Sequence, residues 1–488
     1  MSLLGTPSDG TPDVEKKKDS EVLPASPDLY EVTLSEAEDP QNISLGRKWL
    51  ATLILSLSCV CVTCNASISA SASVGVANAF GVSQEVTVLA LSLFILGLGL
   101  GSLIFQPLGE IYGKNIIYRL SFIFLFAFTW AVAFAPDIAV YIIFRFICGF
   151  CGSAFLCIAG GTISDMFSNA EVATPMAIFT ISPVIGPIVG PVIGGFINQN
   201  TSWRWTFRVM LIWIFFQTIL IIICVPETTI QVLLSRKVAK LRKTTGDNKY
   251  WASVDRVPGG SVRSALLANL YKPFEILIFD LMSFLLALWN ALILGILYLA
   301  FQSFPIVFAK QHHFNAQMTG LSFLGLLVGV LLALSTQPLW NAYMRRQATA
   351  HHGVPPPEAN LVMGQAGGVL VPLGLFWFAF TTYSSVHWIV PMLACVPLGA
   401  GMYGVFVSTF TYLAVAYRPV AALALTSNNA FRSSFAAGFP LFAAAMYARL
   451  GTAGATALLA GLTTVMAPLP FIFYFIGARL RARSRFAA

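Results

Sequence analysis

The sequence predicts an all-α polytopic membrane protein with twelve transmembrane helices, arranged as two halves of six. Mean hydropathy is +0.76. Hydrophobic residues make up 57% of the chain and charged residues only 10%, whereas an ordinary soluble domain is about 25% charged. Apolar runs long enough to span a bilayer, about 20 residues each, occur twelve times. A polar, basic segment, residues 231–272, separates the first six runs from the last six.

The predicted spans divide the chain into five parts. The spans start near Trp49, Val86, Ile117, Ile138, Pro175, Phe207, Ile276, Gly320, Leu361, Trp388, Ala421 and Ala453. The parts are an N-terminal tail (1–45), a first six-helix half (46–229), a central loop (230–273), a second six-helix half (274–478) and a basic C-terminal tail (479–488).

Loop charges predict the orientation of the chain. Of the 29 Lys and Arg residues, the outer loops receive four if the N-terminus is cytoplasmic: Arg204, Arg208, Lys310 and Arg449. Arg145 and Arg432 lie within spans, and the other basic residues fall on the inner side, so both termini are predicted to be cytoplasmic. The acidic N-terminal tail has no apolar run and is expected to be disordered, being neither a signal peptide nor a folded unit.

The two halves share a short repeated pattern. "QPLGEIYGK" (106–114) follows span two and "QPLWNAYMR" (337–345) follows span eight. Matched residues at matched places favour a duplicated six-helix unit, which is one of the repeat arrangements of transporters, with the substrate site near mid-membrane between the halves.

Several motifs in this order resemble the major facilitator superfamily, and most closely the fungal twelve-span drug:proton antiporters. "GEIYGK" (109–114) is similar to the loop motif between spans two and three, and "RFICGFCGS" (145–153) to the span-four motif with its embedded arginine. "GPIVGPVIGGF" (186–196) is similar to the span-five antiporter motif. "YLAFQSFPIVF" (298–308) and "NNAFRSSFAAGFPLFAAAMYARLG" (428–451) resemble the fungal branch. Gln106 and Lys114-Asn115 depart from the usual loop motif, so a thinner charge network is expected there.

The resemblance implies a fold and a function. It implies the major facilitator fold and secondary active export driven by a proton gradient, without an enzymatic activity. The implied partners are protons, a small-molecule substrate and the bilayer, with no nucleic acid, and the implied state is a monomer in the plasma membrane or, alternatively, the vacuolar membrane. No catalytic triad order, nucleotide-binding loop or metal cluster is visible in the sequence, so no cofactor, catalytic residue or metal is expected.

Arg145 is the first candidate functional residue. It lies about eight residues, or roughly 12 Å, inside span four, where an arginine costs about 3 kcal/mol even on the milder scale. It therefore faces the bundle interior. One interpretation is a structural arginine bound to helix carbonyls; the other, implied by the resemblance, is a role in proton coupling.

Polar residues on other spans are candidates for a substrate cavity. Arg432 in span eleven shares a face with Asn428 and Asn429, and could bind a carboxylate or a flat ligand; the alternative is a contact between helices. Asn65 in span one, and Asn290 and Tyr298 in span seven, belong to polar stripes that are expected to face the bundle centre.

Three further groups have expected roles outside the cavity. Gly186, Gly190 and Gly194, with Pro187 and Pro191, form a structural hinge or seal in span five. Glu110 and Lys114 are candidates for a cytoplasmic gate, with a solvated surface pair as the alternative. Asn200 starts an outward-facing sequon, a possible glycosylation site. His312 and His313 are expected to be exposed in an outer loop.

Charge is the one guide to the cargo. The deep parts of the spans carry two arginines and no carboxylate, and a polyamine would need a buried acid. The sequence thus favours an anionic or neutral cargo, such as an organic acid (itaconate is one in the resembling family) or a secondary metabolite. A multidrug or polyamine:proton antiporter remains an alternative, as does a proton-coupled importer of the same fold.

Overall fold

The computed structural model of this chain describes residues 30–35, 38–168, 171–247, 249–252, 262–351 and 355–486. Contacts divide the chain into two compact units. The membrane unit comprises Leu34–Leu233 and Gly259–Ala488, and a small unit comprises Met1–Thr33 and Leu234–Pro258. Most of the N-terminal tail expected to be disordered, residues 1–29, lies outside the described residues.

The described residues of the first half of the membrane unit and of the segment after it form ten α-helices and one short 3₁₀ helix. In chain order they are η1 (Pro40–Asn42), α1 (Leu45–Phe80), α2 (Gln84–Tyr112), α3 (Lys114–Ala133), α4 (Ile138–Gly152), α5 (Ala154–Cys157), α6 (Ala159–Met166), α7 (Ala173–Asn200), α8 (Trp203–Cys224), α9 (Ile230–Thr245) and α10 (Val262–Phe279). Helices α4 to α6 together form span four.

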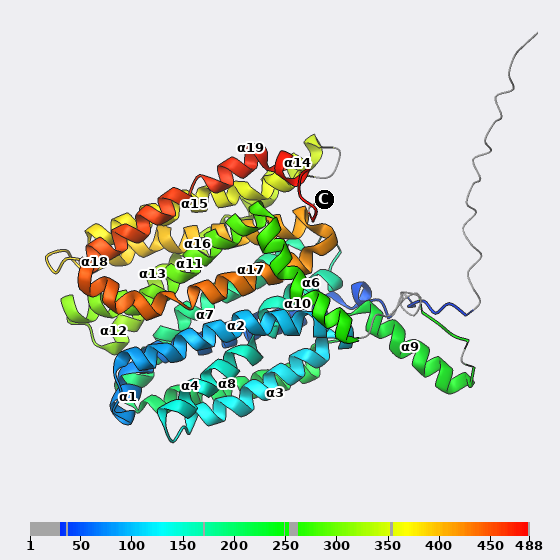
Figure 1. Cartoon of the computed structure of the whole chain (residues 1–488), viewed down its shortest axis with the longest axis horizontal. Coiled ribbons are helices and arrows are strands. Elements are labelled where there is room, and N and C mark those ends of the chain that lie inside the picture. Colours follow the sequence, from blue (N-terminus) through cyan, green and yellow to red (C-terminus); the bar gives the residue numbers. More distant parts are fainter. Residues whose placement is uncertain are drawn as a thin grey trace, which may run out of the picture. The chain divides into compact units, whose positions relative to one another are not determined.

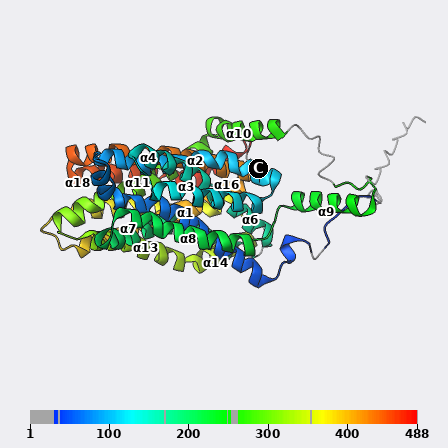
Figure 2. The ribbon, with the colours of Figure 1, turned by 90° about the horizontal axis from the view of Figure 1, so that it is seen from below.

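The second half repeats six spans with more interruptions. Its helices are α11 (Leu281–Phe304), the π-helix η3 (Pro305–Gln311), α12 (Ala316–Leu321), α13 (Leu324–Ser335), α14 (Gln337–Ala350), η4 (Pro357–Asn360), α15 (Leu361–Phe380), α16 (Ile389–Ala416), η5 (Arg418–Val420), α17 (Ala421–Ala436), α18 (Phe439–Met466) and α19 (Leu469–Arg481). Figures 1 and 2 show the spans of both halves running side by side along one direction.

The twelfth span is separated from the eleventh by a turn at Gly451. Length and hydropathy alone give eleven candidate spans in the described residues, the last of which is Ala421–Arg481 with 61 residues. A straight helix of that length would measure about 90 Å, three times the hydrocarbon thickness. Gly451 has φ 70° and ψ 173°, which is not helical, and Figure 1 shows the chain reversing in α18. The described residues therefore contain the twelve spans that the sequence predicts.

Span seven begins later than the sequence predicts. Asp280, and not a residue near Ile276, marks its start, because the Asp280 carboxylate accepts a hydrogen bond from Ser283 N at 3.0 Å and so caps α11. The residues before it belong to α10, a separate helix that packs against α2 and α17. The predicted central loop, residues 230–273, thus contains α9 and most of α10.

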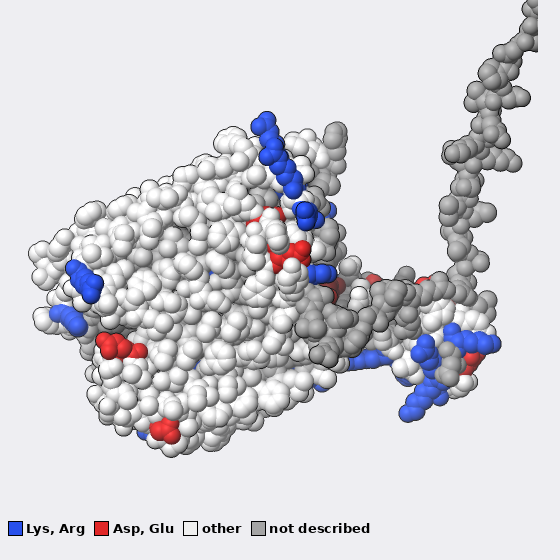
Figure 3. All heavy atoms as spheres, in the orientation of Figure 1, with Lys and Arg blue, Asp and Glu red and all other residues white. Residues whose placement is uncertain are grey.

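Charged side chains mark the two ends of the spans. The end at which α2 passes into α3 carries Lys114, Arg345, Arg346 and Arg481 and is called the basic end; the other is called the distal end. Between the ends, many large apolar side chains face outward, including Ile223, Val465 and Phe475, each more than 70% exposed. On the face drawn in Figure 3 this middle region carries almost no charge. Such a belt is suited to lipid.

Glycines allow α1 and α7 to lie in direct contact. A Cβ at Gly186, Gly190 or Gly194 would collide with Thr63, Ser67 or Ser71 of α1, respectively. Ser67 Oγ also donates to Gly186 O at 3.3 Å. Helix α7 stays continuous although Pro183, Pro187 and Pro191 lie inside it. The glycines of the hinge or seal predicted in span five therefore pack directly against span one.

Two pairs of helices make the most extensive contacts between the two halves. Helix α2 packs against α17, and α7 packs against α12. At the distal end, a Cβ on Gly195 would meet Ala316 O, and a Cβ on Gly320 would meet Pro191 O. Gln199 Oε1 also accepts a hydrogen bond from Ala316 N at 3.1 Å. Gly195, Gln199 and Gly320, which the sequence did not single out, thus form a close distal contact between the halves.

The repeated Q-P-L pattern has matching geometry in both halves. Gln106 Nε2 donates to Glu110 Oε1 at 3.1 Å, and Gln337 Nε2 donates to Asn341 Oδ1 at 3.4 Å. Both pairs are four residues apart on a helix that reaches the basic end. The shared contact supports duplication of a six-helix unit.

The histidines at the distal end differ in environment. His313 is exposed, as expected, and has the positive φ of 59° that few non-glycine residues adopt. His312 is instead partly buried, because its ring lies near Phe308 and Phe314, with centroid distances of 6.3 and 6.4 Å. Its Nε2 is buried and has no hydrogen-bond partner within the described residues. Burial, His387 and His313, in that order, lower the pKa of His312 below its usual 6.5.

We predict that Gly451→Ala lowers the midpoint of thermal unfolding. The Gly451 conformation is accessible essentially to glycine alone, so a side chain there costs about 1–3 kcal/mol in backbone strain. No heavy atom lies within 4 Å of the place that a Cβ would occupy, so a clash would not explain the loss. Gly461→Ala is the matched control, because Gly461 is helical and equally open. Equal midpoints for the two variants in detergent would contradict the turn.

We predict that His312 makes the protein less stable in acid. A folded-state pKa below the unfolded value means that stability is fully present above about pH 6.5 and is lost as the pH falls below that value. His312→Phe, which cannot be protonated, should show a smaller loss of thermal stability between neutral and acidic pH. His313→Asn, an exposed change that tolerates positive φ, removes only the smallest of the three causes that lower the pKa of His312, so it should keep most of the wild-type pH dependence. The measurement is the unfolding midpoint across a pH series.

Candidate functional site

A small cavity lies between the two halves near the middle of the spans. It encloses about 20 Å³, room for a single water molecule. Both halves line it, through Thr63, Leu98, Leu156, Pro183, Val184, Leu294, Leu297, Tyr298, Phe406, Arg432 and Ser433. The cavity is therefore too small for an organic molecule, which enters only after the halves move apart, and this arrangement is called the closed form.

Arg432 supplies the positive charge of this cavity. It lies eleven residues into α17 and is 4% exposed. One nitrogen of its guanidinium donates to Asn429 Oδ1 of the same helix at 2.8 Å. Its guanidinium carbon lies over the rings of Phe406 and Phe410, at 5.4 and 5.1 Å from the ring centroids. Its Nε has no hydrogen-bond partner in the described part of the chain, so Arg432 retains binding capacity.

The predicted asparagines lie around Arg432 rather than along the cavity wall. Asn290 Nδ2 of α11 donates to Asn428 Oδ1 of α17 at 3.2 Å, and both residues are fully buried. Asn290 Oδ1, Asn428 Nδ2 and Asn429 Nδ2 have no partner among the described residues. Buried polar atoms without partners are uncommon in native proteins. Three of them beside a buried arginine give this region unusual capacity to bind a polar group.

Arg145 is in a different environment from Arg432. It is 1% exposed, and its guanidinium donates to Asn65 O (2.8 Å), Asn65 Oδ1 (3.2 Å), Ala66 O (2.9 Å) and Ser69 Oγ (3.0 Å), all on α1. Phe94 and Phe207 lie 4.3 and 5.7 Å from its guanidinium carbon. The geometry is that of the structural interpretation, in which α4 is joined to α1. Asn65, expected in the cavity, is the partner of Arg145 instead.

The cavity includes residues that the sequence did not single out. Thr63, Phe406 and Ser433 line it together with the expected Tyr298 and Arg432. Ser433 follows Arg432 directly and so had a sequence signal, whereas Thr63 lies about 160° around span one from Asn65, on the side away from the polar stripe. Phe406 had none, because one more phenylalanine in an apolar span carries no information about which way it faces.

Buried carboxylates are found only at the basic end within the described residues. They are Asp280 and Glu358, 5% and 7% exposed. Asp280 accepts hydrogen bonds from Tyr417 at 2.7 Å and from Ser484, and burial together with Asp280 raises the pKa of Tyr417. Arg481 binds Glu358 through two nitrogens, at 2.9 and 3.1 Å. These contacts join spans seven, nine, ten and twelve.

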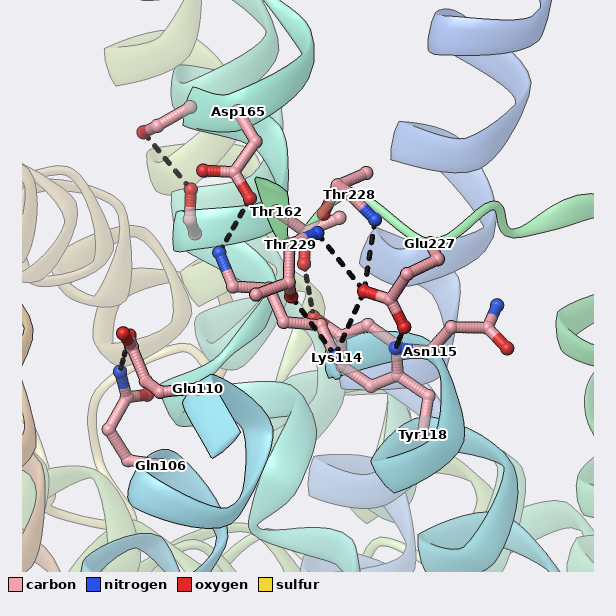
Figure 4. Close-up of polar contacts among 12 residues, drawn as sticks. Gln106, Glu110, Lys114, Asn115, Tyr118, Thr162, Asp165, Glu227, Thr228 and Thr229 are labelled. Atoms are coloured by element: carbon pink, nitrogen blue, oxygen red, sulfur yellow. Dashed lines mark hydrogen bonds and ion pairs between the residues drawn. The ribbon is translucent and has the colours of Figure 1, made fainter. Parts of the chain in front are cut away.

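The predicted pair Glu110 and Lys114 does not form. Glu110 is exposed and contacts Gln106, whereas Lys114 Nζ binds Asp165 Oδ2 of α6 at 2.6 Å (Figure 4). The reason is that α2 ends at Tyr112 and the chain turns at Gly113 into α3, so the two side chains leave different helices. Asp165 was not predicted, since 51 residues separate it from Lys114.

Glu227 holds the first turn of α3 at the basic end. Its carboxylate accepts from Lys114 N at 3.1 Å and Asn115 N at 3.3 Å, and from Thr228 N and Thr229 N of its own segment (Figure 4). Helix α3 has no side-chain cap of its own, so Glu227 satisfies donors that would otherwise lack partners. Together with Lys114 and Asp165 it joins spans two to four to the end of span six.

Asn200 is the last residue of α7 at the distal end. It is exposed, and its Nδ2 donates to Phe196 O at 2.9 Å. Its use as a glycosylation site stays a prediction.

Comparison with known proteins agrees with this geometry. Residues 54–440 match the family model described as Major Facilitator Superfamily. The chain is 43% identical over 391 residues to "Efflux pump atB" of Aspergillus terreus, covering 79% of this chain and 82% of that protein. It is 36% identical over 388 residues to "Probable drug/proton antiporter YHK8" of Saccharomyces cerevisiae, covering 79% and 75%.

Solved structures show the same fold at low sequence identity. The proton:xylose symporter XylE aligns with a TM-score of 0.64 at 13% identity, covering 88% of this chain and 96% of that chain. The human organic anion transporter MFSD10 aligns with a TM-score of 0.56 at 15% identity, covering 87% and 99%. The family match, the relatives and the two-half architecture around a closed central cavity agree: this chain belongs to the major facilitator superfamily, as a multi-pass membrane transporter related to fungal efflux pumps and not as an enzyme.

Proposed function

We propose that this transporter exports a small organic anion, an organic acid or an acidic secondary metabolite, in exchange for protons. The observation that carries the cargo class is Arg432, which faces the cavity with an Nε that has no partner among the described residues. Acidic residues are absent from the middle of every described span. A carboxylate in a low-dielectric cavity gains more from a charge-assisted hydrogen bond than it does in water.

The surroundings of Arg432 favour a ligand with a flat or apolar part. Phe406 and Phe410 lie beside the guanidinium, and most of the cavity lining is apolar, so a carboxylate binds Arg432 while the rest of the ligand meets apolar cavity walls. Asn428 and Asn429 offer two further donors near the same charge. The site thus binds the anionic group of the ligand through Arg432 and its other polar groups through neutral side chains. A few polar groups in a mostly apolar lining are the usual composition of a small-molecule site.

Export and proton coupling rest on the relatives. A protein 43% identical is named an efflux pump and one 36% identical a probable drug/proton antiporter. Alternating access requires the closed cavity to open toward one side at a time. Release at the distal end requires the α7–α12 contact around Gly195 and Gly320 to separate. We propose the plasma membrane as the site of action, with both termini and the basic end cytoplasmic and the chain acting as a monomer.

Arg145 acts in this scheme through the contacts and the charge that it places at its position, and not by transferring a proton. A guanidinium stays protonated in proteins, so Arg145 does not itself carry the proton. We propose that its four bonds to α1 keep α4 and α1 together while a fixed positive charge lies beside the cavity, and that proton-driven movement depends on both. Glu110 and Lys114 contribute to the gate at the basic end, Lys114 through Asp165.

A multidrug or polyamine antiporter is the second candidate, because one relative is named a drug/proton antiporter. Cationic cargo would need an acid, and the buried acids Asp280 and Glu358 lie at the basic end with partners already bound. A proton-coupled importer has the same topology and differs only in the direction of driven flux.

The test is proton-driven uptake into inside-out vesicles, with a labelled dicarboxylate and a labelled polyamine offered separately. We expect saturable dicarboxylate uptake that collapses with a protonophore, and no polyamine uptake. Arg432→Gln should weaken apparent affinity by about ten- to a hundredfold, the loss of one charge-assisted hydrogen bond. Arg119→Gln, which removes a partly exposed arginine of α3 that contacts Ile222 O, is the control and should leave affinity unchanged.

Other outcomes of that experiment are equally informative. Polyamine uptake in place of dicarboxylate uptake would overturn the charge argument. Uptake that ignores the protonophore would overturn proton coupling. Proton-driven movement of cargo only in right-side-out vesicles would identify an importer.

We predict that Arg145→Lys abolishes proton-driven flux although it preserves the charge. An ammonium group lacks the planar fork that reaches four acceptors on α1. Cargo-for-cargo counterflow, which needs binding and movement but no proton, should persist. Arg119→Lys should behave as wild type in both assays. Normal proton-driven flux in Arg145→Lys would remove Arg145 from the coupling mechanism.

A further inference from the structure

Helix α9 has two opposite faces of different character. At 100° per residue, Leu234, Val238 and Leu241 lie on one side of the helix. Arg236, Lys240 and Lys243 lie on the opposite side and form a line, called the basic stripe. The helix has no acidic residue. A helix with this pattern is amphipathic, and what covers each face decides what it can bind.

The apolar face of α9 is already covered within the small unit. Leu234, Val238, Val32 and Ala252 are all buried. The segments that carry Val32 and Ala252 pair with each other, Val32 N donating to Trp251 O at 2.9 Å and Trp251 N to Tyr30 O at 3.0 Å. Thus the part of the N-terminal tail around Val32, which the sequence predicts to be disordered, is structured and pairs with the segment around Trp251.

The cations beside the apolar face hold these segments in place. Lys237 Nζ donates to Thr33 O at 2.9 Å, and Arg242 Nε donates to Tyr250 O at 2.8 Å. The basic stripe is different. Arg236, Lys240 and Lys243 are exposed, and their side chains form no ion pair or hydrogen bond with the described residues. In Figure 3, Lys and Arg side chains gather over the α9 region.

The start of α9 is fixed at the basic end of the spans. Thr229, directly before the helix, accepts a hydrogen bond from Lys114 N at 3.3 Å through its hydroxyl, and five residues connect α8 to α9. The basic stripe therefore begins about 9 Å and ends about 20 Å along the helix from this point. A helix this short keeps its cations tethered close to the point where the chain leaves the membrane unit.

We propose that the basic stripe binds the anionic headgroups of phospholipids in the leaflet at the basic end. Juxtamembrane cations are attracted to such headgroups, and the attraction falls off within a Debye length of about 8–10 Å. Because the apolar face is covered, α9 does not insert into the bilayer as a bare amphipathic helix would. The attachment is electrostatic and is reversed by salt.

The test is amide hydrogen exchange of the full-length protein in nanodiscs of phosphatidylcholine with or without phosphatidylserine. Phosphatidylserine should slow exchange of the amides of residues 234–245 by about ten- to a hundredfold, the effect of up to three surface cations. About 1 M salt, with a Debye length near 3 Å, should remove this protection. The readout needs no transport, so its failure leaves the proposed function intact.

Two triple variants separate the basic stripe from general charge. Arg236→Gln/Lys240→Gln/Lys243→Gln should show no dependence on phosphatidylserine. Arg345→Gln/Arg346→Gln/Arg479→Gln, which removes three exposed charges at the basic end, should keep it. Equal exchange in both kinds of nanodisc would overturn the proposal. Salt-sensitive protection in phosphatidylcholine alone would overturn it too, since the stripe would then bind an acidic protein segment.

Discussion

A guanidinium buried in the middle of a membrane bundle is costly unless its donors find acceptors, and in this chain α1 supplies those acceptors to Arg145. Two backbone carbonyls, one amide oxygen and one hydroxyl of α1 receive its hydrogen bonds. The same helix lies in direct contact with the glycines of α7. Helix α1 is thus held to span four by hydrogen bonds and to span five by close packing. The first half depends on this combination, because spans four and five meet the second half across the cavity.

The two embedded arginines illustrate how similar residues take different roles. Arg145 makes four hydrogen bonds to a neighbouring helix of its own half and leaves only its Nε without a partner among the described residues, whereas Arg432 binds its own helix and faces the other half. Leaving Nε of Arg432 and three asparagine atoms without partners among the described residues is destabilising by about 1–3 kcal/mol for each group. A site that opens to bind a polar ligand recovers that free energy on binding, which fits a central cavity of only about 20 Å³ in the closed form.

The basic end contains a separate network in each half. In the first half, Lys114, Asp165 and Glu227 connect the loop after span two with the ends of spans four and six. In the second half, Asp280 and Glu358 bind residues from spans ten and twelve and from the C-terminal tail. Each network stays within its half, so neither opposes the movement of one half relative to the other.

The sequence by itself determined the membrane class, the twelve spans and the two embedded arginines. These follow from local properties, since apolar length, loop charge and a cation inside an apolar run are all readable along the chain. The start of span seven was misplaced because α10 ends in four apolar residues, 276–279, directly before Asp280, so the apolar run in the sequence begins before the span does.

Partner choice was decided only by the tertiary structure. Lys114 binds Asp165 and not Glu110, and Asn65 binds Arg145 and does not line the cavity. Helix α9 is covered by one segment that precedes the first half in the sequence, around Val32, and by one that follows it, around Ala252. These contacts join residues 51, 80 and more than 200 positions apart. Which of these contacts form depends on how each helix is rotated about its own axis. That rotation is set by packing against all neighbouring helices, and a helix that is apolar on every side carries no pattern that predicts it.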